Sequence, residues 1–296
     1  MNQAQASATI GEKAFRVFLF VFFLLFSVTV VYPFVYLLAL SFNEGTDALR
    51  GGITILPRMF TVENYRIIFE NPQLLHGVLN SFLRTVIGAC SATFFSGFLG
   101  YTFTKRKLVG YRFYITILVI PMYFTAGIIP TFLVYRSLGL INNFLVYIVP
   151  NLVWAYNIII MRTFISSLPQ ALEESAFIDG ANEYTIFFRI ILPLSLPAFA
   201  TIVLFDAVWH WNSWFDTILY APREGLETLM SILARMLLEL RAREIAGLKA
   251  SKHAMNITSE TLRAAMTIAT TLPIVLVYPF LQKYFVKGVL IGAVKG

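Results

Sequence analysis

Long apolar runs alternate with polar connections along this chain of 296 residues. A helix needs about 20 mostly apolar residues to cross the hydrocarbon core of a bilayer. The runs are too long for the alternating ten-residue pattern of membrane strands, and backbone groups in lipid must bond internally, so we expect helices. The pattern predicts an all-α, polytopic membrane protein with about six spans, at roughly Phe15–Leu40, Val78–Thr104, Phe113–Arg136, Phe144–Ile165, Leu196–Tyr220 and Ala264–Phe285.

The connections between these runs differ in length and charge. Residues 41–77 form a long, mixed connection in which Gly51, Gly52 and Pro57 indicate irregular chain. Residues 221–263 form the longest and most charged one, although the middle of it, Leu229–Leu248, has a helical composition. We therefore expect one transmembrane domain, residues 1–296, with two long loops on one side of the membrane.

Composition supports a membrane protein and excludes several other classes. Hydrophobic residues make up 58% of the chain and charged residues 13%, about half of the charged fraction of a soluble domain. The net charge is +7, but the basic residues are scattered and form no stripe with aromatic residues, so we expect no nucleic-acid partner. The single cysteine, Cys90, excludes an intrachain disulfide.

The basic residues of short loops predict the orientation. The connection Lys105–Arg112 is short and carries four basic residues, and such loops stay in the cytoplasm. With six spans, this places both termini and the polar loop of residues 166–195 in the cytoplasm, and the long loops 41–77 and 221–263 outside. The first apolar run, Val17–Leu40, is longer than the apolar part of a signal peptide, so we expect it to remain as a span.

The polar loop of residues 166–195 has the pattern of two short helices. Ser167 with Gln170 predicts the start of the first helix, Leu168 to Ile178, and Asp179-Gly180 predicts its end. Asn182 predicts the cap of a second helix, Glu183 to Ile191, which Pro193 is expected to stop. Periodicity alone leaves two interpretations open: an amphipathic hairpin on the membrane surface, or a docking element for a protein. The acidic residues of the loop favour the protein.

The loop contains the pattern E-x-A-x-x-D-G-A from Glu174 to Ala181, followed by I-x-L-P from Ile190 to Pro193. This pattern resembles the EAA loop of inner-membrane permease subunits of bacterial ABC importers, with Ser175 where the family has alanine. The resemblance implies that the first short helix enters a cleft of an ATPase subunit and that ATPase closure drives alternating access. The ATPase-coupling residues that it implies are Glu174, Ala176, Asp179, Gly180, Ala181 and Pro193.

The C-terminal segments resemble one branch of the same family. The end of the chain, Gln282–Gly288 and Gly292–Gly296, resembles that of the smaller permease of maltose-type importers, in which the tail reaches between the two ATPases. This resemblance implies an ATPase contact for Lys295 and Gly296. Ile257–Arg263 and Tyr278–Leu281 further resemble the subgroup for complex or polymeric sugars. The implied partners are a second permease subunit, two ABC ATPases, an extracytoplasmic binding protein, membrane lipids and an oligosaccharide, of which an alginate fragment is one hypothesis. The implied location is the bacterial inner membrane.

Polar and aromatic residues inside the spans suggest where a sugar could bind. Sugars present apolar CH faces between hydroxyl groups, so a path for them needs aromatic side chains beside hydrogen-bonding ones. An interfacial aromatic belt with polar contacts between helices is the alternative interpretation of the same residues. The candidates for the substrate path are Trp209, Asn212, Trp214 and Asp206 in the fifth span, and Asn157 and Tyr156 in the fourth.

The sequence offers little support for chemistry carried by this chain alone. It has no G-x-x-x-x-G-K-[ST] motif, so we expect no cofactor here and expect ATP and magnesium on the partner ATPase. The three histidines lack metal-ligand spacing, so we expect no metal site. A secondary transporter that acts alone and is coupled to an ion remains an alternative, although Asp206 has no counterpart in the first half of the chain. A membrane-embedded enzyme is a third hypothesis, without a catalytic constellation to support it.

Overall fold

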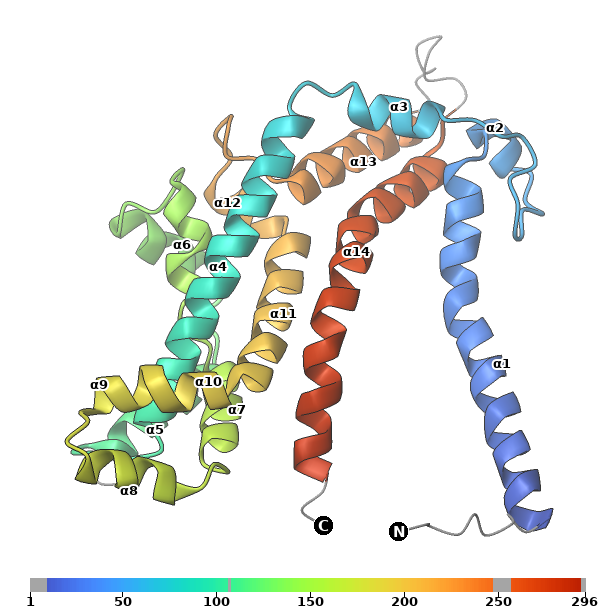
Figure 1. Ribbon diagram of the computed structural model, residues 1–296. Helices are drawn as coiled ribbons and strands as arrows, with labels where there is room; N and C mark the ends of the chain where they lie inside the picture. Colours follow the sequence, from blue (N-terminus) through green and yellow to red (C-terminus); the bar gives the residue numbers. More distant parts are fainter. Residues whose placement is uncertain (1–9, 106–107, 247–256, 294–296) are drawn as a thin grey trace. The chain divides into compact units, whose positions relative to one another are not determined.

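The computed structural model describes residues 10–105, 108–246 and 257–293 (Figure 1). Within these residues the secondary structure is helical, apart from one isolated antiparallel bridge between Asn43 and Phe60. The chain divides into two compact units: Met1–Glu70 with Leu237–Thr271, and Asn71–Met236 with Leu272–Gly296. The all-helical membrane fold predicted from the apolar runs is confirmed, whereas the single-domain organisation stays a prediction.

The first unit begins with α1 (Ile10–Ser41), which contains the predicted first span. Its membrane-spanning stretch, Gly11–Ser41, buries none of its most apolar window against the rest of the chain. A helix that is apolar on all sides needs lipid or another protein around it. Helices α13 (Leu229–Ile245) and α14 (Ser259–Ala293) each contribute residues to both units, and α13 lies where the sequence has a helical composition within the long loop.

A hydrogen-bonded loop follows α1 and includes α2 (Gly45–Ala48) and α3 (Glu63–Phe69). Asn43, fully buried, accepts hydrogen bonds from the backbone N–H groups of Arg58 and Met59 at 2.8 and 2.9 Å. Its amide nitrogen donates to Asp47, whose carboxylate also accepts from Arg58 Nε at 2.9 Å. The loop predicted as irregular chain therefore has a defined structure, because the side chain of Asn43 bonds both Asp47 and the backbone at Arg58 and Met59.

The hydrogen bond from Arg58 lowers the pKa of the Asp47 carboxyl below its usual 3.8. A lowered pKa in the folded loop means that ionised Asp47 stabilises it. This contribution is complete above the usual pKa and is lost as the pH falls through the lowered value.

We predict that Asn43→Ala opens this loop. The change leaves two buried N–H groups without an acceptor, which lowers the free energy of local opening by about 1–3 kcal/mol. Hydrogen–deuterium exchange of the amides of Arg58 and Met59 should then become faster. The control is Thr46→Ala, because Thr46 is exposed and should leave these amides unchanged. Equal protection in Asn43→Ala and the parent protein would contradict the prediction.

The second unit is built around α4 (Leu74–Thr102), which packs against α7 (Ala155–Ile165) and α11 (Leu196–Asn212). Glycines on α4 permit this close approach. A Cβ at Gly97 would lie 2.0 Å from the ring of Phe199, one at Gly88 would lie 2.4 Å from the His210 ring, and one at Gly100 would lie 2.8 Å from Met161. Small residues serve this purpose in membrane helices, where lipid is as apolar as a leucine side chain.

Three predicted spans, the third, fourth and fifth, are not continuous helices. The third is broken into α5 (Tyr111–Tyr123) and α6 (Ile128–Ser137), because the chain is extended at Phe124 and Gly127 has a φ of 82°. Pro121 lies near the end of α5, and Pro130 lies in the first turn of α6. The fourth consists of the 3₁₀ turns η1 (Phe144–Tyr147) and η2 (Val149–Asn151), followed by α7. The direction of the chain changes by 48° between these turns and α7.

The fifth predicted span is also divided, into α11 and α12 (Phe215–Tyr220). By length and composition, three helices in the described residues can each cross a membrane. Up to five spans result if two bent pairs each count as one, Phe144–Asn151 with Ala155–Ile165 and Glu183–Leu194 with Leu196–Asn212. A multi-pass membrane protein is thus confirmed, whereas the number six remains a prediction.

Candidate functional site

The polar loop of residues 166–195 forms two short helices joined by a tight turn. The first, α8 (Gln170–Ile178), ends with the N–H of Ala181 bonded to the carbonyl of Ala176 and the N–H of Gly180 bonded to that of Phe177. These two bonds define a Schellman motif, which requires a left-handed residue. Gly180 supplies it with a φ of 82°, so the predicted end of the helix at Asp179-Gly180 is confirmed.

Asn182 caps the second helix, as predicted, by accepting a hydrogen bond from the N–H of Thr185 at 2.9 Å. This helix runs as α9 (Glu183–Ile186), a π-helical turn (Phe187–Ile191) labelled η3, and α10 (Leu192–Leu194). The prediction that Pro193 stops it is wrong, since the helix continues to Leu194. Pro193 has no N–H to bond to Arg189, and the wider π turn lies where that bond is missing.

The predicted cap at the start of the first helix is also wrong. Ser167 donates its hydroxyl backwards, to the carbonyl of Phe164 at 2.6 Å, and the residue before α8 is Pro169. Pro169 has an extended conformation, with φ −61° and ψ 121°, which sets the entry of the chain into α8 without a side-chain cap.

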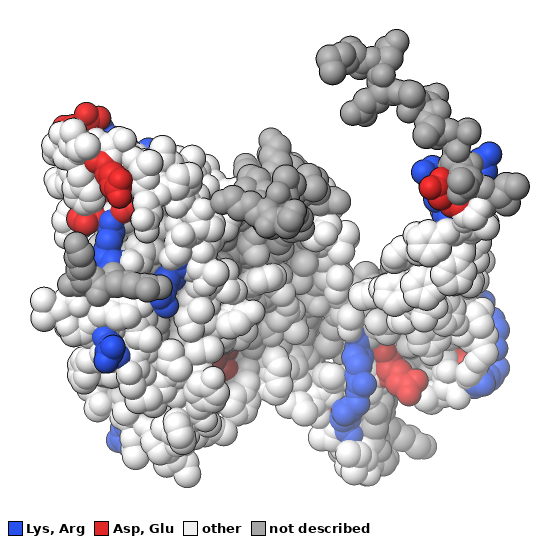
Figure 2. Space-filling view, turned by 90° about the horizontal axis from the view of Figure 1, so that it is seen from below, with Lys and Arg blue, Asp and Glu red and all other residues white. Residues whose placement is uncertain are grey.

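One side of this helical pair is buried and the other is exposed. Ala176 packs with Ile186, Phe187 and Ile191 in a hydrophobic core that also includes residues of α4, α7 and α11. Glu174, Asp179 and Gly180 are exposed, and Ile178 is 86% exposed. Figure 2 shows acidic side chains gathered at the left of the molecule, over the end that carries these helices. The helical pair is therefore fixed to the transmembrane helices while it presents acidic and apolar side chains outward.

A cavity of about 280 Å³ lies between α7 and α11 in the same unit. Its walls combine aromatic and polar side chains, among them Asn151, Trp154, Tyr156, Asn157, Asp206, Trp209 and His210. The rings of Trp154 and Trp209 meet edge to face, with centroids 5.6 Å apart. Trp209 contacts the ring of His210 in the same way, and His210 Nδ1 is buried without a hydrogen-bond partner in the described residues.

Asp206 ties three helices together beside this cavity. Its carboxylate accepts hydrogen bonds from Asn157 of α7 at 2.8 Å and from Thr93 of α4 at 3.1 Å. A buried acid in a bilayer needs such donors, because each unsatisfied polar group there is costly. Two donors therefore explain how α11 can carry an acid at this depth.

The structure brings four of the six predicted substrate-path residues together. Asp206, Asn157, Tyr156 and Trp209 all line the cavity. Asn212 instead donates its amide to the carbonyl of Val208 on its own helix and lines a neighbouring hollow, and Trp214 contacts Phe215. The cavity walls therefore do not include these two. The predicted tail residues Lys295 and Gly296 lie outside the described residues.

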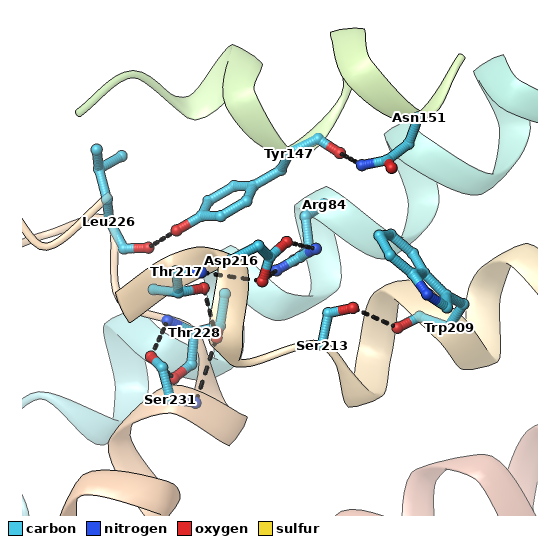
Figure 3. A network of polar contacts seen from close by, with 10 residues as sticks. All are labelled: Arg84, Tyr147, Asn151, Trp209, Ser213, Asp216, Thr217, Leu226, Thr228 and Ser231. Atoms are coloured by element: carbon cyan, nitrogen blue, oxygen red, sulfur yellow. Dashed lines mark hydrogen bonds and ion pairs between the residues drawn. The ribbon is translucent and has the colours of Figure 1, made fainter. Parts of the chain in front are cut away.

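A buried ion pair that the sequence pattern did not predict lies near the cavity (Figure 3). The guanidinium of Arg84 on α4 is fully buried and bonds the Asp216 carboxylate of α12 at 2.6 and 3.3 Å. It also lies 4.3 Å from the centre of the Tyr147 ring, whose hydroxyl donates to the carbonyl of Leu226. The signal that could have found it was an arginine inside a predicted span, because such residues almost always have a partner.

We predict that Arg84→Met destabilises the protein. The change leaves Asp216 without its cation, and loss of one partner of a buried pair costs about 3 kcal/mol, at the low end because Asp216 keeps some solvent contact. The midpoint of thermal unfolding in detergent should fall. The double variant Arg84→Met/Asp216→Asn should recover part of this loss, because it removes the unpaired charge.

Arg189→Met is the control, since Arg189 is exposed. A midpoint for Arg84→Met equal to that of Arg189→Met would show that the pair does not stabilise the fold.

The described residues contain no group of three or more His, Cys, Asp or Glu side chains that could hold a metal ion.

Comparisons with known proteins match nearly the whole chain. Residues 92–291 match the sequence profile of the family described as binding-protein-dependent transport system inner membrane component. The chain is 36% identical to the polygalacturonan/rhamnogalacturonan transport system permease protein YtcP of Bacillus subtilis, over 96% of this chain and 99% of that protein. It is 28% identical to the arabinooligosaccharides transport system permease protein AraQ of Halalkalibacterium halodurans, over 90% and 91%.

The fold matches that of a solved transporter. A chain of a bacterial ABC transporter involved in the import of the acidic polysaccharide alginate superposes with a TM-score of 0.80. The two sequences are 28% identical, and the match covers 95% of this chain and 100% of that one.

Proposed function

The chain belongs to the family of binding-protein-dependent transport system inner membrane components, and we propose from this that it is a permease subunit of an ATP-driven importer of oligosaccharides. It would form half of the translocation path. The observation that carries the proposal is the helical pair of residues 170–194. Its exposed face, with Glu174 and Ile178, is free for a partner, while Ala176 and the residues around it anchor the pair to the transmembrane helices.

The proposed mechanism is mechanical. An ATPase subunit would hold α8 in a cleft, with Glu174, Asp179 and Gly180 at the contact. Closure of two ATPases around ATP would move the helical pair, and the buried contacts of Ala176 would carry this motion into the spans. Gly180 and Ala181 would keep the turn rigid through the two backbone hydrogen bonds of the Schellman motif, and Pro193 lies where the pair joins α11.

The proposed complex contains a second permease, two ATPases and an extracytoplasmic binding protein. ATP and magnesium would bind the ATPases, because this chain has no P-loop sequence. The loops of residues 41–77 and 221–263 would face the binding protein, with both termini in the cytoplasm. Lys295 and Gly296 would contact the ATPases. The protein is a multi-pass inner-membrane component by its family and its apolar helices.

We propose a fragment of an acidic polysaccharide as the substrate class. The support comes from similar proteins, one named for polygalacturonan and rhamnogalacturonan and one described for alginate. The cavity supports a saccharide in general, because Trp154 and Trp209 offer ring faces and edges while Asn157 and His210 offer polar atoms. Sugar-stimulated ATP hydrolysis should be measured with galacturonate, alginate and arabinose oligosaccharides, each with the binding protein.

The alternative of an ion-coupled transporter that acts alone loses support from the structure of its proposed site. Asp206 is the acid that such a mechanism would use, and it is already bonded by Asn157 and Thr93 as a link between helices. Family membership also counts against this alternative.

We predict that Gly180→Pro uncouples transport while the chain still inserts into the membrane. Proline fixes φ near −65°, whereas Gly180 has a φ of 82°, and proline also lacks the N–H that bonds Phe177. Uptake of sugar by cells should be lost. Gly180→Asn is the matched control, because asparagine tolerates the left-handed conformation best among other residues and should retain most uptake.

A pull-down in mild detergent tests the partner at the same time. ATPase that co-purifies with the parent chain but not with Gly180→Pro would support the docking role. Normal uptake of sugar by cells with Gly180→Pro would contradict the mechanical model.

We predict that Trp209→Ala reduces sugar-stimulated ATP hydrolysis about tenfold, while basal hydrolysis changes less. Loss of one aromatic contact is worth roughly 0.5–1.5 kcal/mol, and the upper end of this range corresponds to about tenfold. Trp214→Ala is the matched control, since it removes the same side chain outside the cavity wall and should leave stimulation intact. Equal losses of basal and stimulated hydrolysis in Trp209→Ala would indicate a packing role instead.

A further inference from the structure

Lys105, in the connection after α4, binds carboxylates from both helices of the pair that carries the proposed docking face. Its Nζ forms an ion pair with Glu173 of α8 and lies 3.4 Å from Oε2 of Glu183 of α9. The same Nζ lies over two rings, 4.6 Å from the centre of Tyr101 and 5.5 Å from that of Phe177. One cation thus joins the end of α4 to both arms of the turn.

Tyr101 adds a second link from α4 to the same acid. Its hydroxyl donates a hydrogen bond to Oε2 of Glu183, and its side chain is only 4% exposed. The side chains of Lys105 and Glu173 are 28% and 21% exposed, so water screens their attraction only in part. Because Glu173 and Glu183 carry like charges close together, the lysine also offsets their repulsion.

This contact differs from the other connections of the pair. The chain itself joins α8 to α7 and α10 to α11, whereas α4 contacts the pair through side chains. Aromatic contacts link α4 to the π turn, with the rings of Phe98 and Phe187 5.4 Å apart. The ion pair of Lys105 with Glu173 adds a charged contact between the connection after α4 and α8, the helix with the exposed face.

Helix α4 continues from this contact to the cavity. Tyr101 and Thr93 are eight residues apart on one helix, a distance of about 12 Å at about 1.5 Å per residue. Thr93 bonds Asp206 at 3.1 Å, and Gly88 lies against the ring of His210. A displacement of α4 at Lys105 therefore reaches two residues of the cavity wall through one helix.

We propose that Lys105 is a positioning residue that transmits motion of α8 to α4, and so to the cavity, during transport. The proposal rests on the proposed importer function. It assigns to Glu173, which is 21% exposed, an inward role, distinct from the outward role of Glu174, which lies next to it but is exposed. Assembly with the ATPase would not depend on Lys105, because the turn and the buried Ala176 maintain the helical pair.

The experiment uses the whole complex, with both permeases and the ATPases, in proteoliposomes. The quantity measured is sugar transported per ATP hydrolysed. Lys105→Met should lower this ratio at least about fivefold, the lower end of ordinary coupling between two sites. Co-purified ATPase and basal hydrolysis should match those of the parent complex. Arg112→Met is the control, since it removes an exposed positive charge near the same connection and should not change the ratio.

Two rescue variants separate charge from simple structural damage. Lys105→Arg keeps the cation and should restore most of the ratio. The exchange Lys105→Glu with Glu173→Lys also places a cation beside Glu183 and should transport better than Lys105→Glu alone.

An unchanged ratio in Lys105→Met overturns the proposal, and so does loss of the ATPase from this variant, which would assign Lys105 to assembly. Failure of the exchange to rescue also counts against it. If the parent complex contains no ATPase, the proposed importer function fails instead, so the two failures can be told apart.

Discussion

The close approach of α4 to α7 and α11 is the contact on which the rest of the larger unit depends. Glycines at positions 88, 97 and 100 remove the side chains that would keep these helices apart. Because the helices lie so near one another, short polar side chains such as Thr93 and Asn157 reach Asp206 directly. The same proximity brings Arg84 within reach of Asp216 and lets Tyr101 meet Glu183 at the end of the helix.

Two sets of buried polar groups in this unit cross between helices. One set is the ion pair of Arg84 with Asp216. The other is Asp206 with the amide of Asn157 and the hydroxyl of Thr93, and each set connects helices that are distant in sequence. In a bilayer, van der Waals packing and such bonds replace the hydrophobic effect as the source of association between helices. They also position the aromatic walls of the cavity, since Trp209 and His210 follow Asp206 closely on α11.

Local features of the sequence predicted the structure best. The turn at Gly180 and the cap at Asn182 depend on residues within one helical turn, so their chemistry decides the conformation. The break between α5 and α6 could not be predicted in this way, because prolines at positions 121 and 130 are compatible with one kinked helix or with two. Whether Ser167 caps a helix depended on a competing acceptor, the Phe164 carbonyl, which lies one turn earlier.

Periodicity could not predict contacts between residues that are distant in the sequence. Arg84 and Asp216 are 132 positions apart, and nothing in either segment names the other. The same limit applies to the tryptophans. Trp209 and Trp214 are the same residue type and lie close together in the sequence, but α11 ends at Asn212, and only Trp209 lies in the cavity wall. The residues that the family pattern marks in the docking loop have defined positions, for example Glu174 on the exposed side of α8. Their role in coupling stays a proposal.

The exposed Ile178 has a thermodynamic consequence for the assembly. An isoleucine side chain that is 86% exposed in the isolated chain contributes about 1.5–3 kcal/mol if a partner buries it completely. Burial of apolar surface lowers the heat capacity and is driven by entropy near room temperature, so its contribution weakens on cooling. With the proposed docking, the complex would therefore hold its ATPase more weakly in the cold than at growth temperature.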